Sequence, residues 1–235
     1  MRLISSLRAA SVAALLAAPF MATSVAQAAG GSLLAPGTAI VPMTATGTLG
    51  TLLASNSQDF FVDGASSDIQ GTLRTAVFQD ADGTLDFVLQ VTNTAPTAVG
   101  FGSFGRLTTG NFASFLTSVG FFTNDADGAG LFTAGLESPD FADRGADGEV
   151  IGFDFLATGG GKIAPGETSS ILVISTNATN FAAGDTSVIN GVAFSGRGFR
   201  PVAPNNVIPE PGTMALLATG LLPMAGAIIR RRRSN

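Results

Sequence analysis

Carboxylate side chains gather in three short stretches of the 235-residue sequence. The stretches are QDADGTLD with Asp80, Asp82 and Asp86, NDADG with Asp125 and Asp127, and DRGADGEVIGFD with Asp143, Asp147, Glu149 and Asp154. Calcium takes about six to eight oxygen ligands, and alternating Asp residues around a glycine turn can present several of them at once. Asp-Gly is also the favoured hairpin turn, so the same residues predict either turns or a calcium-binding loop.

The third stretch loosely follows the helix-loop-helix calcium template. Asp143, Asp147 and Asp154 stand at its first, fifth and twelfth positions, with Gly148 at the glycine position. Gly145 occupies the third ligand position, and Asp154 replaces the usual bidentate glutamate. These departures leave turn formation as the alternative reading of the segment.

The residue types required by most catalytic mechanisms are missing. The chain has no Cys and no His, which excludes Ser-His-Asp and Cys-His catalysis, zinc sites built from those residues, and haem ligation by them. A carboxylate pair could still hydrolyse a glycosidic bond, but no Trp or Tyr is present to stack a sugar ring. We therefore predict a non-enzymatic protein with no cofactor except calcium as an alternative, and keep a carboxylate-based glycan enzyme as a further alternative.

A glycine-rich stretch, Gly100 to Gly105, matches G-x-G-x-x-G by its letters. A dinucleotide site also needs a strand before this motif and a helix that begins within it. The segment before it contains proline and RLTTGN follows it, so neither condition is met. We expect a glycine-rich turn or bulge.

Short alternating runs predict strands throughout the body of the chain. In GTLRTAVFQDADGTLDFVLQVTN, two such runs flank Asp82-Gly83, which predicts a β-hairpin with one apolar face inward. Further strands are expected in 38–49, 58–63, 117–123, 149–157, 169–177 and 187–199. The window 110–122 fits a short helix or a strand pair equally well. The stretch 124–148 is expected to be either a long surface loop or the least ordered part of the domain.

These elements predict an all-β fold, an antiparallel β-sandwich of immunoglobulin-like or jelly-roll-like type. Phenylalanine is expected to supply the aromatic core, because Tyr and Trp are absent. Residues 29–208 contain six basic and sixteen acidic side chains, which gives this part of the chain a formal charge of −10. Nucleic acid is therefore excluded as a partner, since phosphate binding needs clustered cations.

The N-terminal residues 1–28 have the layout of a secretory signal peptide. Arg2 and Arg8 precede an apolar run, and Ala26-Gln27-Ala28 forms an A-x-A cleavage site before Ala29. An uncleaved membrane anchor is the alternative. The prediction implies the Sec machinery and signal peptidase as partners, followed by a sandwich domain at 29–200.

The C-terminal residues combine a membrane-length span with a basic end. Residues 212–229 carry no charge, and as a helix they would reach about 27 Å, close to a hydrocarbon core of about 30 Å. Arg230, Arg231, Arg232 and Arg233 follow, which places them on the cytoplasmic side and the body outside the cytoplasm. A linker at 201–208 is predicted to separate this transmembrane helix from the sandwich.

Pro209-Glu210-Pro211, the uncharged span and the four arginines together resemble the PEP-CTERM sorting signal of exopolysaccharide-producing Gram-negative bacteria. The resemblance covers 209–235 and implies a transient inner-membrane anchor, recognition of the triplet by an exosortase, removal of the helix and delivery to the surface or matrix. The body also resembles one group of PEP-CTERM proteins, through Leu85 to Asn93 and Pro165 to Thr179. That group implies no activity for particular residues.

From these features we predict an exported surface or extracellular-matrix protein associated with exopolysaccharide or a biofilm matrix. The alternatives are a calcium-dependent adhesion module and a carboxylate-based glycan enzyme.

Overall fold

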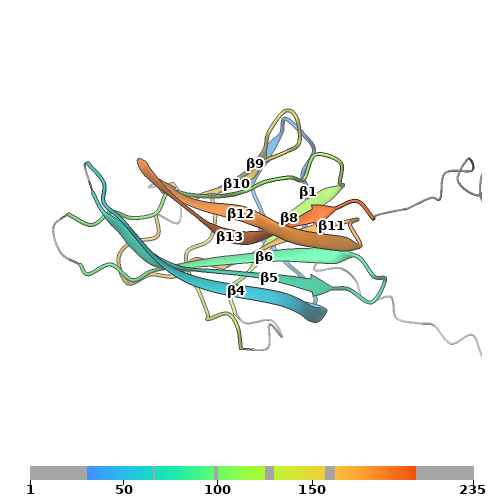
Figure 1. Cartoon of the computed structure of the whole chain (residues 1–235), viewed down its shortest axis with the longest axis horizontal. Helices are drawn as coiled ribbons and strands as arrows, with labels where there is room; N and C mark the ends of the chain where they lie inside the picture. The colour runs from blue at the N-terminus through green and yellow to red at the C-terminus, as the bar shows by residue number, and fades with distance from the viewer. Residues whose placement is uncertain (1–30, 66, 98–99, 125–129, 157–161, 205–235) are drawn as a thin grey trace, which may run out of the picture.

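The computed structural model describes residues 31–65, 67–97, 100–124, 130–156 and 162–204. Its strands form two layers that lie face to face (Figure 1). All registered strand pairs are antiparallel except one short parallel pair between Met43–Thr44 and Gly120–Phe121. The predicted all-β antiparallel sandwich is confirmed, while its assignment to an immunoglobulin-like or jelly-roll-like type stays a prediction.

The larger sheet has seven strands in the order β1-β8-β11-β6-β5-β4, with β3 also paired to β8. These strands are β1 (Ser32–Leu33), β3 (Met43–Thr44), β4 (Thr51–Val62), β5 (Ile69–Gln79), β6 (Leu85–Asn93), β8 (Thr117–Phe122) and β11 (Ile171–Thr176). The smaller sheet has the order β13-β12-β7-β10-β9-β2. Its strands are β2 (Ala39–Ile40), β7 (Arg106–Thr109), β9 (Phe141–Arg144), β10 (Ile151–Asp154), β12 (Asn180–Asn190) and β13 (Val192–Val202).

The predicted hairpin is β5–β6, and its register runs from Gly71 opposite Asn93 to Gln79 opposite Leu85. Asp82 shapes the turn, because its Oδ1 accepts hydrogen bonds from the Thr84 backbone N–H at 2.9 Å and hydroxyl at 2.6 Å. The expected inward face, which includes Leu73, lies in the core between the sheets. The hairpin and its turn are therefore confirmed.

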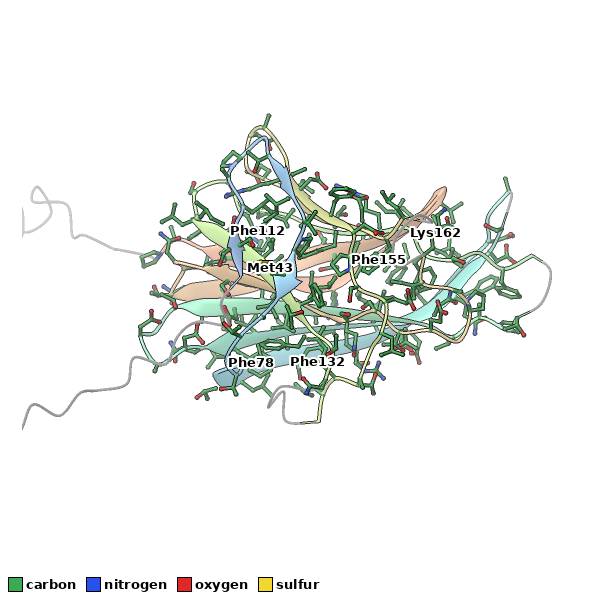
Figure 2. All side chains as sticks on the ribbon, turned by 180° about the vertical axis from the view of Figure 1, so that it is seen from behind. Met43, Phe78, Phe112, Phe132, Phe155 and Lys162 are labelled. Carbon is green, nitrogen blue, oxygen red and sulfur yellow. The ribbon has the colours of Figure 1, made fainter. Side chains whose placement is uncertain are left out.

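The outward face of this hairpin is buried as well, which alternation alone did not predict. Phe78 and Val88 pack in a second cluster with Leu49 and Phe132, contributed by loops that cross over the larger sheet. The Phe78 and Phe132 rings lie 6.4 Å apart on that side (Figure 2). The larger sheet thus has apolar contacts on both faces.

The main core is rich in phenylalanine, as its composition predicted. The Phe60 and Phe194 rings stack at 4.4 Å, and Phe87 meets Phe112 edge-on at 5.5 Å. Aromatic pairs in these arrangements add about 0.5–1.5 kcal/mol beyond the area they bury. Because Phe60 is on β4 and Phe194 on β13, one of these contacts joins the two sheets.

Side chains of β4 also satisfy the backbone at the edge of β13. Asn56 donates its side-chain N–H to the Arg197 carbonyl at 3.1 Å, and the Arg197 N–H donates to Gln58 Oε1 at 3.1 Å. An exposed strand edge invites pairing with other chains. Here the edges of the two sheets cover each other over this stretch.

Two predicted strands are wrong in extent. The stretch 38–49 contains only β2 and β3, which belong to different sheets, because Pro42 has no N–H for a ladder and separates them. The stretch 187–199 is the end of β12, a turn and the start of β13. Gly191 at that turn has φ +73°, a value that favours glycine. Asn190-Gly191 is therefore a hairpin-turn sequence that the prediction of a single strand overlooked.

The structure also shows how three stretches with ambiguous sequence patterns fold. The window 110–122 ends in strand β8, which begins only after a turn in which the Phe115 N–H donates to the Phe112 carbonyl. The stretch 124–148 contains β9 besides its loops. The Gly100–Gly105 stretch makes isolated bridges at Phe101 and Phe104 and leads into β7 rather than into a helix, so it lacks the context of a dinucleotide motif.

β13 extends to Val202, two residues into the segment expected to be a linker, because Phe181 and Asn180 pair with Pro201 and Val202. The predicted signal peptide 1–28 and the predicted sorting span 212–229 lie outside the described residues. Among the residues that are described, no helix is long and apolar enough to cross a membrane.

Candidate functional site

The candidate calcium stretch folds into the β9–β10 hairpin. Ile151 to Asp154 pairs with Arg144 to Phe141, and Asp143 and Asp154 both point away from the core. Between the two carboxylates lies the guanidinium of Arg106, contributed by β7. The structure therefore brings two of the four candidate ligands together, but around a basic side chain of the protein itself.

Arg106 contacts both carboxylates. Its Nη2 donates to Asp143 Oδ2 at 3.0 Å, its Nη1 lies 2.7 Å from Asp143 Oδ1, and Nη1 also donates to Asp154 Oδ2. The hydrogen bond to Asp143, followed by the contacts with Asp154, raises the pKa of Arg106 above its already high ordinary value. The charge of this group is thus fixed at every physiological pH.

Gly152 makes room for this arrangement. A Cβ built at Gly152 would overlap Arg106 Nη2 and Cζ, and would lie 2.8 Å from Asp143 Oδ1. Any larger residue at position 152 would therefore displace the Arg106 guanidinium from the surface of the sheet. The glycine is explained by a close approach of a side chain rather than by a turn.

The other two candidate ligands have different roles. Asp147 Oδ1 accepts a hydrogen bond from the Glu149 N–H at 3.0 Å, which is a turn contact, and the Glu149 side chain is exposed. Among the described residues, no group of three or more His, Cys, Asp or Glu could hold a metal ion. Calcium binding here stays a prediction, and the ion would have to displace Arg106 from Asp143 and Asp154.

Arg144, the residue that follows Asp143, has a structural role that the sequence pattern did not indicate. Arg144 is only 4% exposed, and it faces the core side of β9, as Ala142 does. Its five hydrogen bonds, as many as a guanidinium can donate, all go to carbonyl or hydroxyl oxygens. The acceptors are the carbonyls of Gly148 (3.0 Å), Leu34 (3.2 Å), Phe112 (2.6 Å) and Phe115 (3.0 Å), and Thr117 Oγ1 (2.9 Å).

These contacts join one end of the two sheets. Leu34 follows β1 and Thr117 begins β8 of the larger sheet, whereas Gly148 lies in the β9–β10 turn of the smaller sheet. Burial lowers the pKa of Arg144 from its ordinary high value. The guanidinium is solvated by protein oxygens in place of water, so it stabilises the sandwich end and has no donor left for a ligand.

The first acidic stretch lies at the β5–β6 turn. Asp80 and Asp86 are buried, at 6% and 0% exposure, while Asp82 is exposed in the turn. Burial, with a smaller effect of the neighbouring Asp82 charge, raises the pKa of Asp80 to about 6. Asp80 can therefore take up a proton in mildly acidic conditions. Asp125 and Asp127 lie outside the described residues.

The residues predicted to direct sorting also lie outside the described residues: Pro209, Glu210, Pro211, Arg230, Arg231, Arg232 and Arg233. Residues 207–233 match the family model described as the PEP-CTERM protein-sorting motif, which confirms the resemblance drawn from the sequence. Comparison with curated proteins and with solved structures finds no match. The motif indicates an exported protein that is sorted through exosortase.

Proposed function

Starting from the PEP-CTERM motif at residues 207–233, we propose that this sandwich is a non-enzymatic protein of the cell surface or extracellular matrix. The motif is the single observation that carries the proposal. The sequence adds support, because it lacks the His and Cys of most hydrolytic and metal sites. The ion pairs of Asp143 and Asp154 with Arg106 also support the proposal, because both carboxylates are already engaged by a side chain of the protein itself.

The proposed route begins with the Sec machinery and removal of residues 1–28 by signal peptidase. Residues 212–229 then hold the chain in the inner membrane, with Arg230 to Arg233 in the cytoplasm and the body in the periplasm. An exosortase acts at Pro209-Glu210-Pro211, and the sandwich moves to the surface or the matrix. Residues 203–208 connect the last strand to the triplet.

We further propose that the sandwich associates with exopolysaccharide. Its formal charge of −10 keeps it soluble in a crowded matrix, and its sheets cover each other along the edges of β4 and β13. Both properties suit a protein that works at high local concentration without aggregating.

Substitution of the sorting triplet tests this proposal. In a host that contains a matching exosortase, the change Pro209→Ala/Glu210→Ala/Pro211→Ala is expected to retain the protein in the membrane fraction. A matched control, Asn205→Ala/Asn206→Ala, changes the connecting segment and leaves the triplet intact. Equal release of the triplet variant and the unsubstituted protein would contradict sorting through this motif.

A further inference from the structure

Two surface cavities lie next to each other at the end of the sandwich where Arg144 joins the two sheets. One has a volume of about 310 Å³ and is lined by Leu33, Pro36 and Leu116, with Arg144 also in its wall. The other has a volume of about 250 Å³ and is lined by Arg200 to Ala203. Residues 113–115 line both cavities, so the two are neighbours on one surface, which we call the end groove.

The rim of the end groove is apolar and exposed. Leu33 is 70% exposed and Leu116 is 68% exposed, although most large apolar side chains of the described domain are buried. Adjacent exposed leucines beside a cavity are typical of a surface that another segment covers. The five donors of Arg144 are already used, so the cavity beside the two leucines offers apolar contact, whereas Glu149 and Arg200 line the neighbouring cavity.

The chain itself leads out of this groove. Ala203 is part of the groove wall, and the described chain ends one residue later, at the same end of the sandwich as β1 and β8 (Figure 1). The first large apolar residues beyond that point are Val207 and Ile208. At about 3.6 Å per extended residue they can lie up to about 14 and 18 Å from Ala203. Ala203 and residues 113–115 line the same cavity, and Leu116 directly follows those residues, so a span of this length can cross that cavity toward the rim.

The apolar residues 212–229 are assigned to the membrane, and the N-terminal end offers no comparable side chains. The N-terminal end begins at Gly31 beside Val119, and cleavage before Ala29 would leave only Ala29 and Gly30 ahead of it. A short tether also raises the effective concentration of Val207 and Ile208 at the groove. The segment of stated sequence that fits the groove is thus residues 207–208.

We propose that Val207 and Ile208 dock in the end groove and hold Pro209-Glu210-Pro211 against the rim of the sandwich. The inference rests on the proposed sorting function and adds a role for the folded domain in it. The sandwich then presents the triplet in a fixed position, rather than at the end of a free linker. Leu33 and Leu116 are the positioning residues of this surface.

The absence of cysteine from the sequence allows a direct test. The reporter is Ser114→Cys in the full chain, produced in a host without exosortase and placed in lipid nanodiscs. Ser114 is exposed and lines both cavities, so this substitution leaves the core and the two rim leucines intact. The rate of alkylation by a small maleimide is measured with the natural tail and with Val207→Ser/Ile208→Ser.

Docking is expected to slow alkylation of Ser114→Cys by about tenfold relative to the Val207→Ser/Ile208→Ser form, which corresponds to a docked state populated about nine-tenths of the time. The matched control reporter is Lys162→Cys, an exposed site at the opposite end of the sandwich from Phe112 (Figure 2). Its alkylation is expected to be the same with both tails. Equal rates with both tails at Ser114→Cys would overturn the proposal.

A chain that stops after Ile208 separates docking of the tail from contact with lipid. It keeps Val207 and Ile208 but lacks the span, so the slow alkylation is expected to persist in solution. Protection that disappears in this form would show that the membrane covers the groove and would overturn the proposal. Neither measurement depends on exosortase, so failure of docking and failure of sorting are distinguishable.

Discussion

Asp143 and Arg144 are consecutive residues of β9 that lie on opposite faces of one sheet, and each belongs to an arginine-centred cluster of a different kind. Outside, Arg106 binds two carboxylates at side-chain exposures between 24% and 34%. Inside, Arg144 is almost wholly buried and binds only carbonyl and hydroxyl oxygens. A partly exposed ion pair contributes less to stability than a buried one, whereas removing a buried hydrogen-bonded charge leaves several acceptors unsatisfied.

The comparison explains why an acidic stretch that resembles a calcium loop need not be one. The strand places Asp143 outward, where the Arg106 guanidinium already neutralises it, and places Arg144 inward, where it organises the turn. A cation is thus present at both positions, but the protein supplies it. The predictions below test this contrast, beginning with the buried side.

Replacement of Arg144 is expected to have the largest effect. Arg144→Met leaves the carbonyls of Gly148, Phe112 and Phe115 without the guanidinium donors, and we expect a loss of about 3–5 kcal/mol in the free energy of unfolding. Urea denaturation measures the loss. Arg197→Met, at an exposed arginine, is the control and should change it by less than about 0.5 kcal/mol. A loss below about 1 kcal/mol at Arg144 would remove the distinction between the two clusters.

Gly152→Ala tests the crowded outer cluster. The new methyl group overlaps the Arg106 guanidinium and separates it from Asp143, so we expect a loss of about 1–3 kcal/mol. Gly110→Ala is the matched control, because a Cβ at Gly110 meets nothing within 4 Å. If both substitutions have the same effect, the close approach at Gly152 is not what restricts that position.

Asp80 extends the comparison to a buried acid. Its pKa of about 6 lies above the ordinary 3.8, so the folded state keeps a proton that the unfolded state loses between these values. Stability from this group is therefore fully present below about pH 4 and decreases as the pH rises to about 6. Asp80→Asn should remove this decrease and stabilise the protein at pH 7 by about 1–2 kcal/mol.

Asp82→Asn is the control for this pH dependence, with the opposite sign. Hydrogen bonds from Thr84 lower the pKa of Asp82, so its contribution to stability is present above its unfolded-state pKa and lost as the pH falls. Thermal unfolding across pH 3–8 measures both variants. A pH profile left unchanged by Asp80→Asn would contradict the assignment of the raised pKa to that carboxyl.

Arg106→Gln is expected to have the smallest effect. It removes a partly exposed ion pair and leaves Asp143 beside Asp154, at a cost of about 1 kcal/mol that high salt should reduce. Urea denaturation at low and high ionic strength provides the measurement. A loss as large as that of Arg144→Met, or one insensitive to salt, would show that the two clusters do not differ in the way their exposure indicates.

Alternation predicted the β-rich fold, the β5–β6 hairpin and the Phe core, because these depend on local sequence and on which faces are apolar. It did not predict that loops carrying Leu49 and Phe132 bury the second face of the larger sheet. It also did not separate β12 from β13, although Asn190-Gly191 marks the turn in the sequence. Burial of the second face depends on contacts between segments distant in the sequence. The β12–β13 turn is a local feature that alternation alone does not indicate.

The candidate site was predictable in part. Carboxylates at Asp143 and Asp154 were visible, but their partner Arg106 is 37 residues from the first of them and reaches it only through the sheet order β7-β10-β9. Arg144 left a weaker signal: it follows Ala142 by two residues, so an inward Ala142 places Arg144 inward too. The sorting motif needed no fold at all, since its order of residues is its signal.

Mass spectrometry of the protein recovered from the membrane and extracellular fractions of an exosortase-containing host tests the central proposal most directly. Sorting predicts an extracellular form that begins at Ala29 and lacks the helix and Arg230 to Arg233, beside a heavier and less abundant membrane-bound precursor that retains them. Recovery of intact chains alone, all in the membrane and all ending in Arg230 to Asn235, would contradict it.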